Sequence, residues 1–149
     1  MRKAILILLA VVGLGAIGCG GHVQYAPKEY DTSRKVFGIP PEGHGTIYIF
    51  RDGFLGREVN TTLYIDGMIL GKNLGNTYLC VDVPEGKHKI TSYFTGYTTI
   101  EIDVKQGGLY FIRDSVDTQF TRTDTILTPV GEKEGKTAVK KCYLVESAM

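Results

Sequence analysis

The sequence predicts an all-β fold, an antiparallel β-sandwich or small barrel of seven or more strands, followed by a short C-terminal helix. Short runs rich in β-branched and aromatic residues recur from residue 46 onward, a composition typical of strands. Glycine, proline or aspartate separates most of these runs. In the run 98–105 apolar and charged residues alternate, which indicates a strand with one buried and one solvated face. Many short strands at this spacing favour a sandwich or a barrel.

The first half of this region contains five expected strands joined by tight turns. Asp66-Gly67 lies between two apolar runs and predicts a type I′ hairpin, because that turn needs a positive φ at both central residues. We therefore interpret Asp66 as a turn residue and not as a catalytic group. Another turn is expected at Pro84-Glu85-Gly86. The five strands are expected over residues 46–51, 59–65, 68–70, 78–83 and 87–94.

The second half continues with two clear strands and then a weaker pattern. Turns at Thr95-Gly96 and at 106–108 bound the strand 98–105, and the strand 109–113 follows. One more strand is plausible in the polar, threonine-rich stretch 118–130. Residues 131–141 predict a short helix, since acidic residues begin it and lysines end it, as the helix dipole favours. A last strand is expected over 142–145.

The N-terminus carries the most specific signal in the chain. Arg2 and Lys3 form a cationic start, and residues 4–17 contain no charged or polar side chain, which matches the apolar region of a secretory signal. This run is shorter than the roughly 20 apolar residues that a membrane-spanning helix needs. Small residues then precede Cys19. The segment 1–18 is thus expected to be a cleaved signal peptide.

The cleavage region resembles the lipobox of bacterial lipoproteins, through Ala16-Ile17-Gly18 directly before Cys19. Ala16 stands where a leucine is usual. The resemblance implies cleavage between Gly18 and Cys19, a diacylglyceryl group on the cysteine sulfur and an acyl chain on its new amine, which together give a lasting membrane anchor. Gly20, rather than an aspartate, follows the cysteine, which favours the outer membrane, facing the periplasm. An ordinary signal peptide with a chance cysteine is the alternative.

Three parts of the chain follow from these signals: the signal peptide 1–18, a tether 19–44 and a β-sandwich domain 45–149. The tether contains three prolines and several glycines without a sustained apolar period. A flexible linker of about 25 residues spans roughly 25–30 Å. Only 36–39 is apolar enough to dock on the domain as an edge segment.

Charge argues against nucleic acid as a partner. The full chain has a formal net charge of +1, with 17 basic and 16 acidic side chains. Loss of residues 1–18 removes Arg2 and Lys3, so the mature chain has a net charge of −1. Binding to phosphates draws on many Lys and Arg contacts, which this balance does not offer.

Two cysteines remain once Cys19 is assigned to the lipid. Cys80 and Cys142 are an even pair, which allows one disulfide in an oxidising compartment. Cys80 lies in the apolar run 78–81, so a buried free thiol is the alternative. The wide spacing of the two cysteines argues against a zinc site.

The stretch 45–112 resembles a bacterial lipoprotein domain of unknown function, through the first strand 47–51, the Asp66-Gly67 turn and the segment Pro84-Glu85-Gly86-Lys87-His88. It is also similar to PEGA domains of bacterial surface proteins, through the same Pro84–His88 segment and the Gly96-Tyr97 pair that precedes an alternating strand. Both resemblances imply a small β-sandwich, of the immunoglobulin-like or transthyretin-like kind. Neither implies catalytic residues.

No motif in the sequence indicates an enzyme, a metal or a cofactor. The three histidines form no close metal-ligand pair, and both the Gly-x-Ser-x-Gly elbow and the phosphate-binding loop are absent. Asp52, Asp82 and Asp114 leave open a pair of carboxylates of the kind glycosidases use. His88 either titrates near neutral pH or, as we favour, packs across its turn and bonds to backbone.

Two functions of different classes are therefore expected. The first is a non-enzymatic interaction module, held to the membrane by the lipid on Cys19, that binds a protein of the cell envelope, for example by an exposed edge strand. The second is a carbohydrate or peptidoglycan binder that uses surface tyrosines such as Tyr93 and Tyr97.

Overall fold

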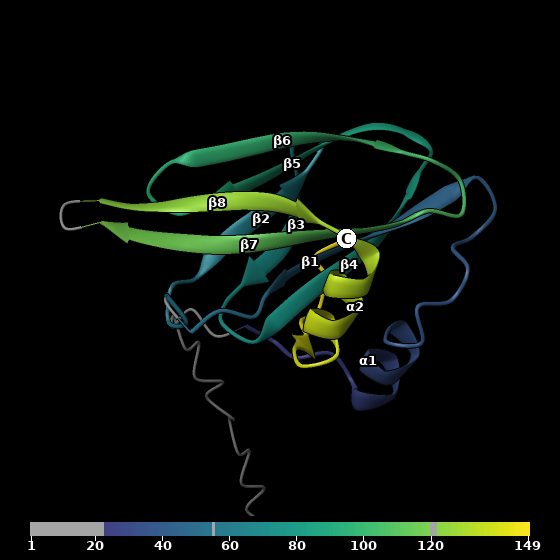
Figure 1. Cartoon of the computed structure of the whole chain (residues 1–149), viewed down its shortest axis with the longest axis horizontal. Coiled ribbons are helices and arrows are strands. Elements are labelled where there is room, and N and C mark those ends of the chain that lie inside the picture. Colours follow the sequence, from purple (N-terminus) through teal and green to yellow (C-terminus); the bar gives the residue numbers. More distant parts are fainter. Residues whose placement is uncertain (1–22, 55, 120–121) are drawn as a thin grey trace, which may run out of the picture.

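The structure is a computed structural model and describes residues 23–54, 56–119 and 122–149. Strands make up most of this part of the chain. Two sheets pack face to face, and two short helices lie beside one of them (Figure 1). The elements, in chain order, are α1 Lys28–Arg34, β1 His44–Arg51, β2 Thr61–Ile65, β3 Met68–Asn73, β4 Thr77–Pro84, β5 Gly86–Tyr93, β6 Tyr97–Val104, β7 Leu109–Gln119, β8 Arg122–Val130, α2 Glu132–Val139 and β9 Tyr143–Leu144. The expected all-β sandwich with a C-terminal helix is confirmed.

The two sheets differ in strand direction. The four-stranded sheet has the order β3-β2-β5-β6 and is antiparallel throughout. The five-stranded sheet has the order β8-β7-β1-β4-β9, and in it β1 pairs with β7, and β4 with β9, in parallel. The expectation of a purely antiparallel sandwich is wrong for these two pairs. Between β1 and β7 the chain forms the whole of the second sheet and also β4, which pairs with β1 on its other side.

The central strand β1 is buried on both faces, which makes the five-stranded sheet the middle layer. Ile47 and Ile49 point into the core between the sheets, and Tyr48 and Phe50 point to the opposite face. Successive side chains of a strand alternate between faces, and a strand covered on both sides reads as a continuous apolar run. On the outer face, α2 packs against β1 and β7, and Figure 1 shows both helices gathered at one edge of the molecule.

The predicted turns are found where local chemistry requires them. Asp66 and Gly67 have φ of 50° and 82°, as a type I′ turn demands, and they join β2 to β3. Glu85 lies between β4 and β5. The threonine-rich stretch contains the expected strand, β8, which pairs antiparallel with β7, with Asp117 facing Asp124.

The segment 23–44 differs from the expected free tether. It contains α1 and is bonded to the C-terminal end of the chain: Ala26 N–H donates to the Leu144 carbonyl at 2.9 Å, and Tyr25 bridges to Val145. Helix α1 contains no buried residue, so an apolar period could not reveal it. Residues 19–22 of the expected tether, and Gly18 and Cys19 at the expected cleavage site, lie at or beyond the edge of the described residues and are not placed.

Candidate functional site

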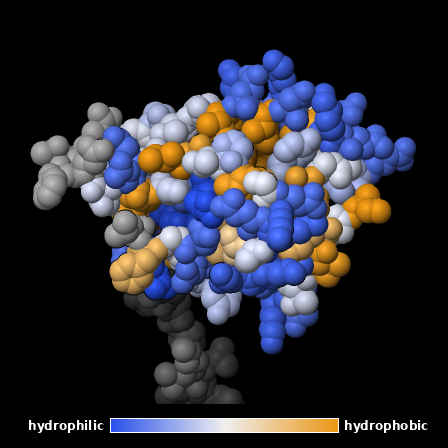
Figure 2. Space-filling view, in the orientation of Figure 1, coloured by the Kyte–Doolittle hydropathy of each residue, from blue (hydrophilic) through white to orange (hydrophobic). Residues whose placement is uncertain are grey.

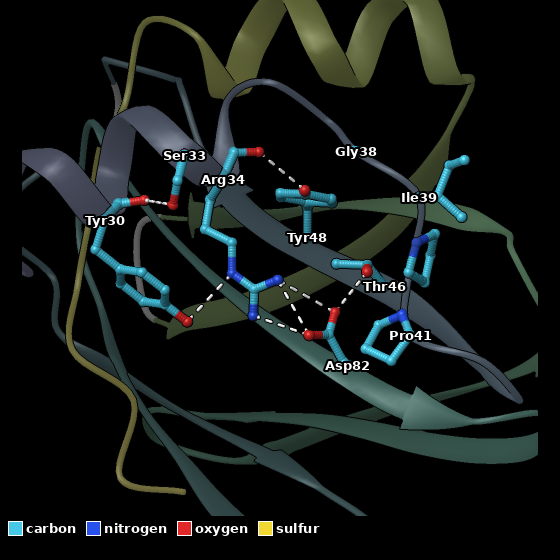
Figure 3. A pocket seen from close by; sticks show the side chains of 10 residues that line it. Tyr30, Ser33, Arg34, Gly38, Ile39, Pro41, Thr46, Tyr48 and Asp82 are labelled. Atoms are coloured by element: carbon cyan, nitrogen blue, oxygen red, sulfur yellow. Dashed lines mark hydrogen bonds and ion pairs between the residues drawn. The ribbon is translucent and has the colours of Figure 1, made fainter.

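A polar pocket of about 300 Å³ lies where α1, the 38–41 loop and the outer face of β1 and β4 meet (Figure 3). Arg34 and Asp82 form its charged centre. Thr46 from β1 adjoins them, and Ile39 stands on the opposite wall, 94% exposed. We call this the Arg34–Asp82 pocket.

Arg34 reaches from the end of α1 to Asp82 on β4. Its Nη1 and Nη2 atoms both lie 3.1 Å from Oδ2 of Asp82, and its Nε donates to the Tyr30 hydroxyl at 3.2 Å. The two charged side chains are 22% and 23% exposed. Burial alone would lower the pKa of Arg34, but the hydrogen bonds to Asp82 raise it above its ordinary value. The pocket therefore holds a permanent cation and its counter-ion, with little net charge.

Strand β1 supplies the polar floor of the pocket because Thr46 and Tyr48 share its outer face. Thr46 is the register partner of Asp82, and its hydroxyl donates to Asp82 Oδ1 at 2.5 Å. Tyr48 donates to the Arg34 carbonyl at 3.0 Å. Burial raises the pKa of Tyr48, so this hydroxyl stays neutral.

The pocket retains hydrogen-bonding capacity for a ligand. Among the residues that the structure describes, only Asp82 accepts a bond from Nη2 of Arg34, and a guanidinium nitrogen of this kind carries two hydrogens. An open pocket with a few polar groups and an apolar rim is suited to binding. Its volume is at the small end of the range of about 300–1,000 Å³ that is typical of ligand pockets.

The three carboxylates considered for acid/base chemistry are not brought together. Each pairs with a different arginine: Asp82 with Arg34, Asp52 with Arg113 at 3.0 Å, and Asp114 with Arg51 at 2.6 Å. The structure therefore contains no facing pair among these three carboxylates of the kind that glycosidases use.

The pair of Arg51 and Asp114 is fully buried and joins the two sheets. Their side chains are 1% and 0% exposed. Asp114 also accepts bonds from Thr61 at 2.8 Å, Asn73 at 2.9 Å and Ser92 at 3.1 Å, all from the four-stranded sheet. Buried charges are tolerated when they are paired and hydrogen-bonded in this way. This cluster is a structural cross-link.

Of the turn-motif residues Asp66, Gly67, Pro84, Gly86 and His88, the structure brings Asp66, Pro84 and His88 into contact. His88 Nε2 lies 2.7 Å from the Pro84 carbonyl, as the favoured interpretation of His88 predicts. Its Nδ1 lies 2.6 Å from Asp66 Oδ2, a contact that was not predicted. Burial alone would lower the pKa of His88, but the bond to Asp66 raises it overall. Burial would raise the pKa of Asp66, but the bond to His88 lowers it overall.

Cys80 and Cys142 are both free and buried in the structure, which corresponds to the buried thiols that the sequence left open beside a possible disulfide. Both belong to the cluster on the outer face of the five-stranded sheet. Burial raises the pKa of each thiol to about 12. Neither is therefore a reactive thiolate at neutral pH.

Tyr93 ends β5 and Tyr97 begins β6, and the two residues face each other across this hairpin. They are register partners, with ring centroids 4.5 Å apart, and Tyr97 is 71% exposed. Beside them the edge strand β8 is partly capped, since the hydroxyls of Thr95 and Thr98 donate to its carbonyls at 2.6 and 2.7 Å.

Sequence reasoning missed the arginine side of these sites. Arg34 lies in the segment interpreted as a tether, and Arg51 ends a strand whose other residues are mostly apolar. One signal was available for Arg34: Pro27 precedes Glu29 and Asp31, which suit the first turn of a helix that ends with a basic residue.

Within residues 23–54, 56–119 and 122–149 no cluster of three or more His, Cys, Asp or Glu side chains could hold a metal ion. In the same part of the chain no helix is long and apolar enough to span a membrane.

Residues 41–126 match the family described as protein of unknown function (DUF2846). An uncharacterised protein of Haemophilus influenzae is 31% identical over 132 residues, which cover 84% of this chain and 75% of that protein. No solved structure matches the chain.

Proposed function

The chain belongs to the DUF2846 family of proteins of unknown function, and on this premise we propose that it is a lipid-anchored, non-enzymatic interaction module of the bacterial cell envelope. The signal-like segment 1–18 and the lipobox-like residues before Cys19 support export and lipidation. Gly20 supports the outer membrane, with the domain in the periplasm. The similarity to PEGA domains is a likeness of turn motifs and agrees with a surface role.

The observation that carries the proposal is that the segment shortly after Cys19 is folded into the domain and builds a wall of the Arg34–Asp82 pocket. Tyr25, six residues after Cys19, already pairs with Val145. Six residues span at most about 20 Å, from roughly 3.3–3.6 Å per residue. The lipid would thus hold the domain close to the membrane instead of on a long tether.

The Arg34–Asp82 pocket is the proposed contact site for an envelope protein. The free hydrogen on Arg34 Nη2 and the oxygens of Asp82 suit a polar side chain or backbone amide of that protein. Ile39 at the rim offers an exposed apolar contact. On the face shown in Figure 2 the apolar residues are scattered among polar ones, which favours recognition at a local site over a broad apolar surface.

Recognition by an edge strand is less favoured than the sequence suggested. The hydroxyls of Thr95 and Thr98 occupy carbonyls of β8. On β3, the Leu70 carbonyl accepts bonds from Ala148 N–H at 2.8 Å and from the Ser147 hydroxyl at 3.2 Å. An added strand would have to displace these contacts.

A non-enzymatic role is supported by how the carboxylates are used. Asp52, Asp82 and Asp114 are each held by an arginine. His88 is bonded at both ring nitrogens. Within the described residues, each of these groups is therefore already bonded to another group of the protein.

The test combines acyl labelling with photo-cross-linking in intact cells of the native host. A photoreactive residue replaces Ile39 at the pocket rim or, as the matched control, Met68 on the far edge strand, which is 55% exposed. Each is made with Cys19 intact and with Cys19→Ser. We expect lipid label only with Cys19 intact, and one envelope protein cross-linked from position 39 but not from position 68.

Absence of label on the protein with Cys19 intact would overturn the anchor. Label without any cross-link specific to position 39 would overturn the pocket as the contact site. Asp82→Asn should weaken the specific cross-link while leaving the label unchanged, which separates the two parts of the proposal.

Carbohydrate or peptidoglycan binding is the second candidate, favoured by the paired rings of Tyr93 and Tyr97. Exposed aromatic faces suit the C–H face of a sugar ring. The test is co-sedimentation with purified peptidoglycan, for which we expect Tyr97→Ala to lower the bound fraction several-fold. Tyr143→Ala, which alters a similarly exposed tyrosine (63%), is the matched control. Equal binding by both variants would remove this candidate.

A further inference from the structure

Two exposed tyrosines stand side by side where the chain enters the domain. Tyr25 is 54% exposed and Tyr143 is 63% exposed. Their ring centroids lie 6.1 Å apart in an edge-to-face arrangement at 79°. A cavity of about 320 Å³ opens beside them and is also lined by Lys28 and Asp31. We call this the Tyr25–Tyr143 surface.

The Tyr25–Tyr143 surface is rigidly attached to the fold. Tyr25 bridges to Val145, and the flanking Gln24 carbonyl accepts the Glu146 N–H at 2.8 Å. Tyr143 lies in β9, its N–H donating to the Asn76 carbonyl at 2.9 Å. The backbone that carries each ring is therefore held to the sandwich.

The distance along the chain limits which surface can meet the membrane. Tyr25 is the sixth residue after Cys19, so the Cys19 backbone, which would carry the acyl groups, would lie within about 20 Å of the Tyr25 backbone. The β5–β6 edge of the sandwich is at the opposite side of the molecule from α1 (Figure 1). A lipid at Cys19 thus draws the α1 and β9 side toward the bilayer and leaves the β5–β6 side facing away.

The chemistry of the surface matches a bilayer interface. Tyrosine is enriched at the level of lipid headgroups, because its ring is apolar and its hydroxyl is polar. The exposed Lys28 lies beside the rings, whereas the Lys35 ammonium, 5.8 Å from the centre of the Tyr143 ring, is paired with Asp31 at 2.8 Å. Ammonium groups at this level can meet lipid phosphates.

We propose that the Tyr25–Tyr143 surface is the membrane-facing surface of the protein, with both rings seated among phospholipid headgroups. This rests on the proposed lipid anchor at Cys19. It fixes the orientation of the domain, so that the Tyr93 and Tyr97 rings face away from the membrane that holds the protein.

The test is hydroxyl-radical footprinting of the full-length lipidated protein on vesicles of phosphatidylethanolamine and phosphatidylglycerol, read residue by residue by mass spectrometry. The reference is the Cys19→Ser protein, free in solution with the same vesicles. We expect vesicle attachment to lower the modification of Tyr25 and Tyr143 at least threefold. Tyr97, which is 71% exposed, is the internal control and should keep its rate.

Equal modification of all three tyrosines on vesicles, or selective protection of Tyr97, would overturn the proposal. A second variant, Lys28→Glu in the lipidated protein, tests whether lipid contact is the cause of the protection. It should reduce the protection of Tyr25 on anionic vesicles and leave the modification of Tyr97 unchanged. Flotation of the vesicles reports the anchor separately. Failure to float would overturn the anchor, whereas flotation without tyrosine protection would overturn only the orientation.

Discussion

Two clusters in this molecule contain the same three residue types, an arginine, an aspartate and a threonine, yet differ in what surrounds them. In the first, Arg51, Asp114 and Thr61 lie between the sheets, almost wholly buried. In the second, Arg34 and Asp82 lie beside a pocket and are each more than one-fifth exposed. The first cluster saturates its aspartate with donors from both sheets. The second leaves hydrogen-bonding capacity open to a pocket.

The contrast shows that residue type alone does not separate a structural ion pair from a binding site. A buried charge requires nearly complete hydrogen bonding, because an unpaired one is costly in a medium of low dielectric constant. A partly exposed pair can remain incompletely bonded, because water serves the remaining groups. Such a pair can exchange water for a ligand.

The largest expected effect comes from breaking the buried cluster. Asp114→Asn keeps the shape of the side chain but leaves the Arg51 charge without its counter-ion. Removal of one partner of a buried pair costs about 3–5 kcal/mol, and we expect a loss of this size in the free energy of unfolding measured with urea. Asp103→Asn, on an exposed aspartate of β6, is the control and should change it by less than about 0.5 kcal/mol. A loss below 1 kcal/mol in Asp114→Asn would show that the cluster is not a cross-link.

A smaller effect is expected at the pocket. Asp82→Asn should lower the free energy of unfolding by about 1 kcal/mol or less, as partly exposed ion pairs do. It should instead loosen α1 locally, because Asp82 holds Arg34. The buried Cys80 thiol reports this opening, because Cys80 belongs to the outer-face cluster near the pocket. We expect iodoacetamide to label Cys80 sooner in the variant, by more than the small change in the free energy of unfolding explains; a smaller acceleration would indicate global unfolding only.

The Asp66–His88 pair differs from the two arginine clusters because the charge of its cation, the His88 imidazole, depends on pH. The pKa of His88 is raised above its ordinary value of 6.5, so the pair contributes its full stabilisation below pH 6.5 and loses it as pH rises through the raised pKa. The pKa of Asp66 is lowered, so its contribution holds above pH 3.8 and is lost as pH falls through the lowered value. Between pH 6.5 and 8.5, wild type should thus lose stability relative to His88→Gln, as urea unfolding at both pH values would measure. Parallel pH dependence in the two proteins would argue against the pair.

The smallest expected effect is that of salt on the coupling free energy of the two ion pairs, and it should differ between the exposed and the buried pair. At 1 M ionic strength the screening length is about 3 Å, and exposed charges are screened far more than buried ones. A double-mutant cycle of Arg34→Gln and Asp82→Asn should lose most of its coupling free energy between 0.05 and 1 M NaCl. The corresponding cycle of Arg51→Gln and Asp114→Asn should keep its coupling. Equal salt sensitivity would mean that water reaches both clusters alike.

The residues of these sites were only partly predictable. Asp82 and Asp114 stood out as carboxylates, but nothing in the sequence assigned one to a pocket and the other to the interior. His88 was correctly interpreted as bonded to backbone, since its turn is local. Its partner Asp66 lies 22 residues away, and only the pairing of β2 with β5 brings the two together.

The sequence by itself determined the features that depend on near neighbours along the chain. The Asp66-Gly67 turn follows from positive φ at adjacent residues, and the alternating strands and the C-terminal helix follow from short-range periodicity. Tertiary structure decided the rest: the parallel pairing of β1 with β7, the docking of α1 and the separation of two similar ion pairs. Arg34 and Asp82 are 48 residues apart, and Arg51 and Asp114 are 63 apart. Contacts between residues so far apart along the chain depend on chain topology and on burial. Local sequence patterns predict neither.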